Sequence, residues 1–271
     1  MIEFTNKTVV VTGGGSGIGF ACARAFASAG ATVVLAGRRA EVLENAATTL
    51  NDELGRECAI AIPADVTDES AVANLFVTAV ERTGRVDVLI NSHGTGGSGN
   101  FLVDMDAATF RATLDTNLTG VFLAMRGALN QMREQSAGVI VNIASMAGRR
   151  ISNSGMGDYV ASKHGVVGLT MQAAAEAAQW NTRVVAICPG TVLTEMIQIA
   201  RGQNAGEKLA KEIPLGEVAL PEDVANLALF LASDLAGKIT GTAIDIDGGQ
   251  WLPVHTDYAK WVRRRNLMNQ M

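Results

Sequence analysis

Seven short runs of aliphatic residues recur along the chain, and longer stretches with helical spacing separate them. The runs are nearly continuous in Val, Ile, Leu and Ala rather than alternating with polar residues, which is typical of strands covered on both faces. Strands that alternate with helices favour a parallel sheet. The predicted strands are KTVVVTG, ATVVLAG, CAIAIPAD, VDVLINS, GVIVNIAS, TRVVAICPG and TAIDIDGG.

Helical stretches fill the gaps between these runs, and two of their starts carry a signal. Thr67 is placed as a cap before Asp68 and Glu69, and Pro221 opens a stretch that continues with two acidic residues. The pattern predicts an α/β, Rossmann-type doubly wound sandwich, in which helices flank a seven-stranded parallel sheet on both faces. The predicted helices lie near residues 17–30, 39–54, 68–82, 107–135, 157–180 and 221–233.

No linker or low-complexity stretch divides the chain, so we expect residues 1–249 to form one Rossmann-fold domain. Residues 190–216 are expected to be a mobile insert, and residues 250–271 a C-terminal tail. The aromatic residues of the tail could cover a cleft of the same or a neighbouring subunit. The alternative is a partly ordered tail with a solvated basic face, and the sequence leaves both open.

Composition and charge exclude several classes of function. The chain has 271 residues, of which 48% are hydrophobic and 18% charged, so it can bury a large core. Its net charge of -5 offers no basic field to nucleic acid or anionic lipid. We expect a cytoplasmic protein without a membrane span, because no run approaches the roughly 18 apolar residues that a span requires. The three Cys and three His lack metal-ligand spacing, so no metal is expected.

The first predicted strand runs directly into a glycine-rich turn, TGGGSGIG, and a helix of small residues follows at once. Glycines allow backbone angles that are closed to other residues and let a pyrophosphate approach the chain. The free N–H groups at the start of the helix would stabilise its negative charge. This order of elements predicts a dinucleotide site, with an ordinary turn as the alternative. The residues assigned to the cofactor here are Gly13, Ser16, Gly17, Ile18 and Gly19.

The second predicted strand ends in Gly37-Arg38-Arg39, where a dinucleotide fold reads the adenosine ribose. A carboxylate at this place would bind the ribose 2′-OH and repel a 2′-phosphate, whereas Arg38 and Arg39 suit a phosphate. NADP(H) is therefore favoured over NAD(H). The alternative is that both arginines are solvated residues at the start of a helix.

Polar residues also follow the third and fourth predicted strands, at the edge of the sheet where ligands bind in such folds. Asp65 and Val66 come after the third strand, and Asn91 and Gly94 after the fourth. All four are assigned to the cofactor site. Asp65 could instead be an ordinary turn acid before the helix at 68.

Tyr159 and Lys163 stand four residues apart in DYVASKHG, on a predicted helix. This spacing is one helical turn, so the ammonium can lie beside the phenol. Tyrosine holds its proton to a pH of about 10, and a neighbouring cation would lower that pKa toward the working range of a general acid or base.

Taken with Asn117, Ser145 and Pro189-Gly190, these motifs resemble the short-chain dehydrogenase/reductase family over residues 7 to about 249. The resemblance implies that Asn117, Ser145, Tyr159 and Lys163 form the catalytic group. Tyr159 would be the general acid/base, Ser145 would hydrogen-bond the substrate carbonyl, and Asn117 would hold a water in a proton relay. Taken alone, Asn117 could be a buried helix contact and Ser145 a cap.

The resemblance also assigns further residues to the cofactor. Lys163 would hold the nicotinamide ribose, with Tyr159 beside it. The segment next to the nicotinamide carboxamide would be Pro189, Gly190, Val192 and Thr194.

Two residues depart from the family pattern. Ser16 stands where many NADP(H)-using relatives have a basic residue, so a 2′-phosphate would rely mainly on Arg38. His93 replaces a small Ala, and packing is a more economical interpretation than contact with cofactor or substrate. Cys188 is interpreted as a packing residue, because nothing near it in sequence indicates an activated thiolate.

The resemblance implies an NADP(H)-dependent oxidoreductase that transfers a hydride between nicotinamide and a ketone or secondary alcohol. A homo-oligomer, either tetramer or dimer, is expected through the stretches 107–135 and 157–180. One alternative is a 3-oxoacyl-carrier-protein-type reductase, which would need a basic patch for its acidic partner. Another, from a different class, is a non-catalytic nucleotide-sensing Rossmann protein.

Overall fold

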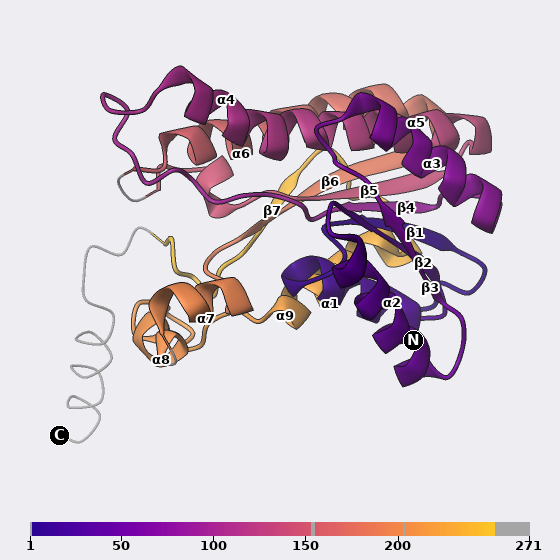
Figure 1. Cartoon of the computed structure of the whole chain (residues 1–271), viewed down its shortest axis with the longest axis horizontal. Helices are drawn as coiled ribbons and strands as arrows, with labels where there is room; N and C mark the ends of the chain where they lie inside the picture. Colours follow the sequence, from indigo (N-terminus) through magenta and orange to yellow (C-terminus); the bar gives the residue numbers. More distant parts are fainter. Residues whose placement is uncertain (1, 153–154, 203, 253–271) are drawn as a thin grey trace.

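The computed structural model describes residues 2–152, 155–202 and 204–252 (Figure 1). Its centre is one parallel sheet of seven strands in the order β3-β2-β1-β4-β5-β6-β7. Each predicted strand is confirmed. The bounds are β1 Thr8–Thr12, β2 Thr32–Gly37, β3 Ala59–Pro63, β4 Val88–Asn91, β5 Gly138–Ile143, β6 Thr182–Pro189 and β7 Ala243–Ile246.

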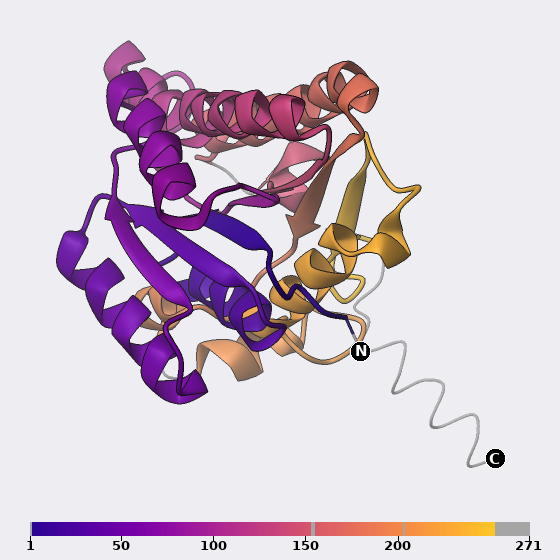
Figure 2. The same cartoon turned by 90° about the vertical axis from the view of Figure 1, so that its right-hand side faces the viewer.

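Helices cover both faces of this sheet, as the pattern predicted, and Figure 2 shows the sheet between the two helix layers. One layer holds α1 (Gly17–Ser28), α2 (Ala40–Leu54) and α9 (Pro221–Ala232). The opposite layer holds α3 (Glu69–Thr83), α4 (Ala107–Leu114), α5 (Gly120–Gln135) and α6 (Gly157–Ala177).

Strand β1 shows why the hydrophobic runs do not alternate. Val9 and Val11 belong to the core under α1 and α9, whereas Val10 belongs to the core on the opposite face. All three are fully buried. A strand with two buried faces needs an apolar residue at every position, and this is the pattern that the sequence carries.

The order in which strands are added to the sheet reverses between β1 and β4: β2 and β3 lie on one side of β1, and β4 to β7 lie on the other. Strand β1 pairs with β2 on one side and with β4 on the other, and Thr12 lies opposite Asn91 at the carboxyl end of that second pair. Ligands of open parallel sheets bind in the crevice outside such a switch point. The glycine turn that follows β1 lies at this place.

The predicted stretch 107–135 is interrupted. Helix α4 ends at Leu114, a π-helical segment covers Asp115–Thr119, and α5 begins at Gly120. A π segment widens the helix by one residue and is frequent at functional sites. Here its central residue is Asn117, whose side chain is fully buried.

The segment 190–216 contains two short helices that the pattern did not predict, α7 (Glu195–Arg201) and α8 (Ala205–Ala210). Each is shorter than two turns, too short to produce a periodic signal. The predicted cap at Thr67 is wrong by one residue, because Asp68 is the N-cap of α3 and accepts hydrogen bonds from the N–H groups of Ser70 and Ala71. The predicted tail begins at residue 250, and its residues 253–271 lie outside the described part of the chain.

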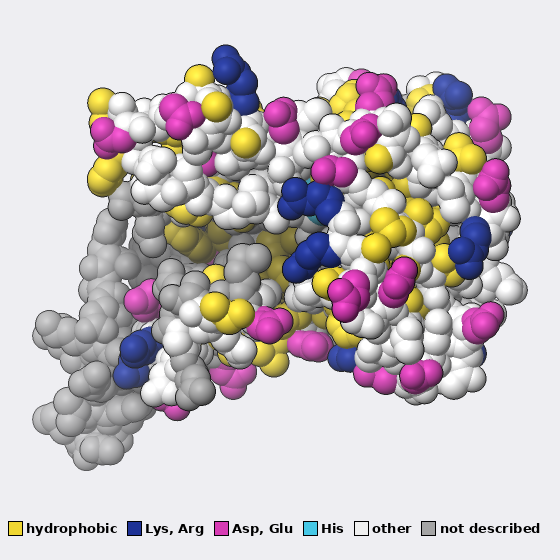
Figure 3. All heavy atoms as spheres, in the orientation of Figure 1, with side chains coloured by type: hydrophobic (Ala, Val, Ile, Leu, Met, Phe, Trp, Pro, Cys, Tyr) yellow, Lys and Arg dark blue, Asp and Glu magenta, His cyan; other side chains and the backbone are white. Residues whose placement is uncertain are grey.

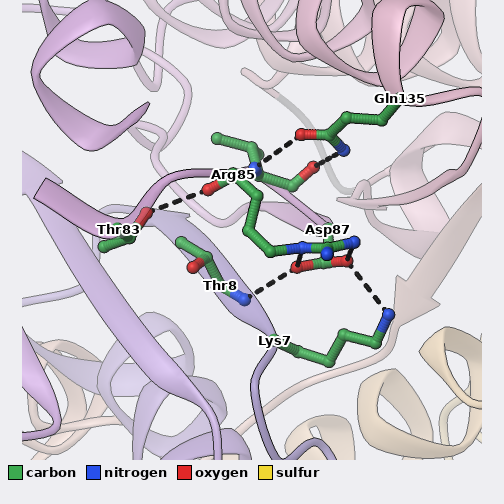
Figure 4. Close-up of polar contacts among 7 residues, drawn as sticks. Lys7, Thr8, Thr83, Arg85, Asp87 and Gln135 are labelled. Carbon is green, nitrogen blue, oxygen red and sulfur yellow. Dashed lines mark hydrogen bonds and ion pairs between the residues drawn. The ribbon is translucent and has the colours of Figure 1, made fainter. Parts of the chain in front are cut away.

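The amino ends of β1 and β4 are joined by an ion cluster, in which the exposed side chains of Lys7 and Arg85 bind the buried Asp87 (Figure 4). Its carboxylate accepts from Thr8 N at 2.9 Å, from Lys7 Nζ at 3.1 Å and from both Nε and Nη2 of Arg85 at 2.7 and 2.6 Å. These bonds hold the pKa of Asp87 below its usual value although burial raises it. The cluster holds β1 and β4 together at their amino ends, opposite the glycine turn at their carboxyl ends.

Among the described helices, none has the length and apolar character that crossing a membrane requires.

Candidate active site

A cleft of about 1230 Å³ opens where the glycine turn meets the ends of β2, β3 and β4. Figure 3 shows this side of the molecule hollowed between the two helix layers, with hydrophobic side chains in the hollow and Lys and Arg side chains beside it. Ten residues predicted for the cofactor line the cleft: Gly13, Ser16, Gly17, Ile18, Gly19, Arg38, Arg39, Val66, Gly94 and Thr194.

Other predicted cofactor residues lie outside this lining, namely Asp65, Asn91, Tyr159, Lys163, Pro189, Gly190 and Val192. The lining in turn includes residues that the sequence did not single out for the cofactor. They include Thr116 from the π segment and Glu195 and Ile199 from α7. Their positions depend on an irregular helix and on a short helix, so no local motif marks them.

The glycine turn is packed against itself and against the end of β4. A Cβ at Gly19 would lie 2.2 Å from the Gly13 carbonyl oxygen, and a Cβ at Gly13 would lie 2.9 Å from the Ser92 carbonyl oxygen. Gly13 and Gly17 also have φ of +70° and +54°, which other residues rarely adopt. Glycine is thus required here, and the start of α1 faces the cleft as a dinucleotide pyrophosphate needs.

The two arginines after β2 line the cleft with exposed side chains. Within the described part of the chain, neither Arg38 nor Arg39 has a carboxylate within ion-pair distance. Asp65 instead accepts hydrogen bonds from Thr67 N at 3.0 Å and Thr67 Oγ1 at 2.8 Å, so it serves as a turn acid. These bonds, together with the Arg38 charge, hold the pKa of Asp65 below its usual value.

Helix α6 brings Tyr159 and Lys163 together as their spacing predicted. Lys163 Nζ lies 5.7 Å from the centroid of the Tyr159 ring and donates a hydrogen bond of 3.0 Å to the Ile143 carbonyl oxygen, at the end of β5. Burial lowers the pKa of Lys163 to about 8. The ammonium therefore keeps most of its charge at neutral pH while lying in a buried position.

The pKa of Tyr159 differs from the sequence expectation. Burial raises it, and only the hydrogen bond with the Ser145 side chain acts in the opposite direction. Lys163 Nζ donates to the Ile143 carbonyl oxygen, and within the described residues it makes no hydrogen bond to the phenol. Ser145 also accepts a hydrogen bond of 3.1 Å from Ala147 N, so this serine is a helix cap as well as a neighbour of the phenol.

The amide of Asn117 is held at both ends. Its Oδ1 accepts from Thr95 N at 2.8 Å, and its Nδ2 donates to the Thr95 carbonyl oxygen at 2.9 Å and to Ser162 Oγ at 3.3 Å. A Cβ at Gly94 would lie 3.3 Å from Asn117 Oδ1 and 3.7 Å from Lys163 Nζ. Gly94 thus joins the cleft to the group formed by Asn117, Ser145, Tyr159 and Lys163.

The segment after β6 reaches the cleft beside the glycine turn at Thr194. Gly190 N donates to the Ile246 carbonyl oxygen, and Thr191 N donates to Gln250 Oε1. Thr194 then caps α7 and approaches the turn, since a Cβ at Gly17 would lie 3.7 Å from its methyl group.

His93 fills the space between the glycine turn and α5. Its Nδ1 lies 2.7 Å from Thr12 Oγ1, and a Cβ at Gly120 would lie 3.0 Å from its Nε2. Nε2 has no hydrogen-bond partner within the described residues. Burial and the charge of Lys163 lower the pKa of His93 to about 3, so the ring is neutral. These are the contacts of a packing residue, and the ring also lines the cleft, where the alternative of a contact with cofactor or substrate stays open.

Cys188 is fully buried at the end of β6. Burial raises the pKa of its thiol to about 11, so the thiol stays protonated at neutral pH. This agrees with its interpretation as a packing residue.

A glycine turn at the switch point of a doubly wound parallel sheet defines a dinucleotide-binding α/β protein. Comparison with known proteins makes the class more specific. A family model described as "Enoyl-(Acyl carrier protein) reductase" matches residues 13–250. Oxidoreductase UcpA of Salmonella typhimurium is 40% identical over 263 residues, covering 93% of this chain and 97% of that protein.

Levodione reductase of Leifsonia aquatica is 36% identical over 255 residues, covering 92% of this chain and 95% of that protein. A crystal structure of a levodione reductase has a TM-score of 0.87 at 34% identity, covering 93% of this chain and 100% of the other. A structure of an actinorhodin polyketide ketoreductase with NADPH has a TM-score of 0.84 at 33% identity, covering 90% and 97%. The chain belongs to the short-chain dehydrogenase/reductase family, whose members are NAD(P)-dependent oxidoreductases of alcohol and ketone groups.

Proposed function

We propose that this protein transfers a hydride between NADP(H) and a ketone or secondary alcohol, with Tyr159 as general acid in reduction and general base in oxidation. The observation that carries the proposal is the position of Lys163 Nζ, 5.7 Å from the centroid of the Tyr159 ring and one turn along α6, with the Ser145 side chain near enough to lower the pKa of the phenol. When bound, the nicotinamide supplies or accepts the hydride.

Each residue of the group has a separate task in this proposal. Ser145 donates a hydrogen bond to the substrate oxygen and stabilises the charge that develops there. Tyr159 gives its proton to the same oxygen in reduction, and its raised pKa keeps that proton in place at neutral pH. Lys163, still largely charged with a pKa of about 8, stabilises the phenolate that remains.

Asn117 holds the chain around the reacting group. Its amide bonds to both polar atoms of the Thr95 backbone and reaches Ser162, one residue before Lys163. We propose that Asn117 also holds a water molecule, as the family resemblance implies, and that this water returns a proton from solvent to Tyr159.

The preference for NADP(H) rests on Arg38. Its guanidinium lies at the cleft without an ion-pair partner among the described residues, and Gly37 leaves space beside it. A guanidinium recognises a phosphate through paired hydrogen bonds, and a carboxylate in its place would recognise the free ribose hydroxyl. The glycine turn, which other residues could not form, supports the fit of a dinucleotide to the cleft.

The substrate is proposed to be a free carbonyl compound rather than a group attached to a carrier protein. An acidic carrier would need a basic surface, and the chain has a net charge of -5.

We also propose a cytoplasmic homo-oligomer that pairs through α5 and α6. Both helices carry exposed apolar side chains, Phe122 and Met171.

The experiment that tests this function measures NADPH and NADH oxidation over a panel of ketones, β-ketoesters, sugars, steroids and quinones. Turnover of at least one carbonyl with NADPH is expected. Tyr159→Phe should then lower kcat by about 10²–10⁴-fold, the range of general acid catalysis, while cofactor binding is preserved. Near-normal rates in that variant would contradict the assignment. Cofactor binding without turnover of any compound would favour the nucleotide-sensing alternative.

A further inference from the structure

A buried carboxylate that the proposed catalytic group does not include stands directly before Tyr159. Asp158 has an exposed fraction of 0%, and no cation lies within ion-pair distance of it in the described part of the chain. A buried charge without an ion pair is costly unless hydrogen bonds compensate it. The carboxylate therefore has to be explained by its donors.

Three donors from three separate segments meet at Asp158. Its Oδ1 accepts from Tyr159 N at 2.9 Å, within α6. Its Oδ2 accepts from Thr113 Oγ1 of α4 at 2.8 Å and from Ser98 N of the segment after β4 at 3.1 Å. Burial raises the pKa of Asp158, but these hydrogen bonds outweigh it and hold the pKa below its usual value. The positive end of α6 also favours a negative charge in its first turn.

The segment 95–98 has a second anchor at its other end. Thr95 is held through both its N–H and its carbonyl oxygen by Asn117, as described above. Between the two anchors lie two glycines. A Cβ at Gly97 would lie 3.1 Å from Asp158 Oδ1 and 3.2 Å from Tyr159 Cβ, so the backbone of this segment rests directly on the tyrosine.

We propose that Asp158 is a positioning residue, whose carboxylate fixes the segment 95–98 against Tyr159 and so forms a rigid wall of the substrate side. The two glycines of this segment have no side chains to hold them in place, and the entropy of ordering the segment has to be offset by its anchors. The inference rests on the proposed function only through the role of Tyr159, and the position of the segment can be measured without turnover.

The test replaces Asp158 by Asn, which has nearly the same shape. The amide replaces one carboxylate oxygen by an NH2 group, which donates and does not accept, and it removes the negative charge. Ser98 N therefore loses its acceptor if the NH2 group takes the Oδ2 position, and keeps only an uncharged one if the oxygen stays there. Amide hydrogen exchange at Ser98 should rise about tenfold or more, the size expected for losing a hydrogen bond to a charged group. Exchange at Thr95 N, which is bonded to Asn117, should stay unchanged and serves as an internal control for global unfolding.

Kinetics provide the second measurement. With an accepted carbonyl substrate, Asp158→Asn should raise KM by about tenfold, again the value of one charged hydrogen bond, while the dissociation constant of the cofactor stays the same. The matched control is Asp104→Asn, which removes one exposed carboxylate after the same segment and should change neither measurement.

A second variant acts on the same contact from the opposite side. Gly97→Ala would place a Cβ 2.8 Å from Met156 Sδ, 3.1 Å from Asp158 Oδ1 and 3.2 Å from Tyr159 Cβ. Even if the flexible Met156 side chain turns aside, the other two contacts push the segment away from Tyr159 while the Asp158 carboxylate stays intact. It should also raise both Ser98 exchange and KM, and it keeps the proposal testable if Asp158→Asn fails to fold. Unchanged Ser98 exchange and unchanged KM in a folded Asp158→Asn protein would overturn the proposal. If Tyr159→Phe remains active, the proposed function fails, but the exchange result at Ser98 still decides the inference.

Discussion

The two ends of the proposed active site are built in opposite ways. Around Tyr159, the polar side chains of Asn117 and Asp158 are fully buried, and each is hydrogen-bonded to more than one segment. At the end of β2, Arg38 and Arg39 are exposed and have no ion pair within the described residues. Groups that hold reacting atoms benefit from fixed geometry, whereas groups that select a cofactor need only present a charge.

The largest effect is expected from breaking the rigid end at Lys163. Lys163→Met keeps the length of the side chain but removes the ammonium that stabilises the phenolate, so kcat should fall by about 10²–10⁴-fold. Steady-state kinetics measure this, with cofactor binding followed by fluorescence. Lys208→Met, at an exposed lysine of α8, is the control and should keep the wild-type rate.

A smaller and selective effect is expected at the exposed end. Arg38→Asp should lower kcat/KM for NADPH by about 10–100-fold, because a charged hydrogen bond to the 2′-phosphate is replaced by repulsion. Activity with NADH should change by much less. Arg39→Asp is the matched comparison and should have the weaker effect of the two. Equal losses with both cofactors would mean that Arg38 does not read the phosphate.

Gly120 packs against Val66 and His93, between the two ends of the site, and a substitution there tests how tightly this region is packed. Gly120→Ala would place a Cβ 2.9 Å from Val66 Cγ2 and 3.0 Å from His93 Nε2, and such overpacking typically lowers the free energy of unfolding by about 1–3 kcal/mol. Gly168→Ala in α6, where a Cβ would meet no atom within 4 Å, should instead stabilise the protein slightly. Thermal unfolding compares them. If Gly168→Ala is also destabilised, replacing a helical glycine is unfavourable by itself, and the contact with His93 is not the cause of the effect at Gly120.

His93 is expected to contribute a pH dependence to the stability of the fold. Its pKa is lowered from 6.5 to about 3 in the folded chain, so between these values the unfolded chain binds a proton that the folded chain does not. Stability should therefore fall as the pH drops from 6.5 toward 3, by at most about 1.4 kcal/mol per pH unit from this one group. Denaturant unfolding of wild type and His93→Ala at several pH values measures the difference in slope. Identical slopes would contradict a neutral, buried ring.

Much of the fold could be predicted because its signals are local. The strands of the sheet are continuous apolar runs, and the glycine turn and the Tyr159–Lys163 spacing are visible in short stretches of sequence. The π segment around Asn117 could not be predicted, because it depends on contacts with Thr95 and Ser162 from distant elements. Helices α7 and α8 are too short to carry a periodic pattern.

The side-chain environment was the least predictable part of the site. The spacing of Tyr159 and Lys163 predicted their proximity but not that Lys163 would turn to the Ile143 carbonyl oxygen. Asp158 stands beside the tyrosine in sequence, yet only the fold brings Ser98 and Thr113 to its carboxylate. A residue whose partners lie on other elements leaves no signal in its own neighbourhood.

The ion cluster at Asp87 has a consequence for how the protein assembles. It joins Asp87 to Thr8, which is 79 residues earlier in the chain, and the segments between them form α1, β2, α2, β3 and α3. Closing so long a loop costs entropy, which the contacts between its two ends have to offset. Since β1 and β4 also form the floor of the cleft, the nucleotide site is complete only when residues 8–91 have closed this loop.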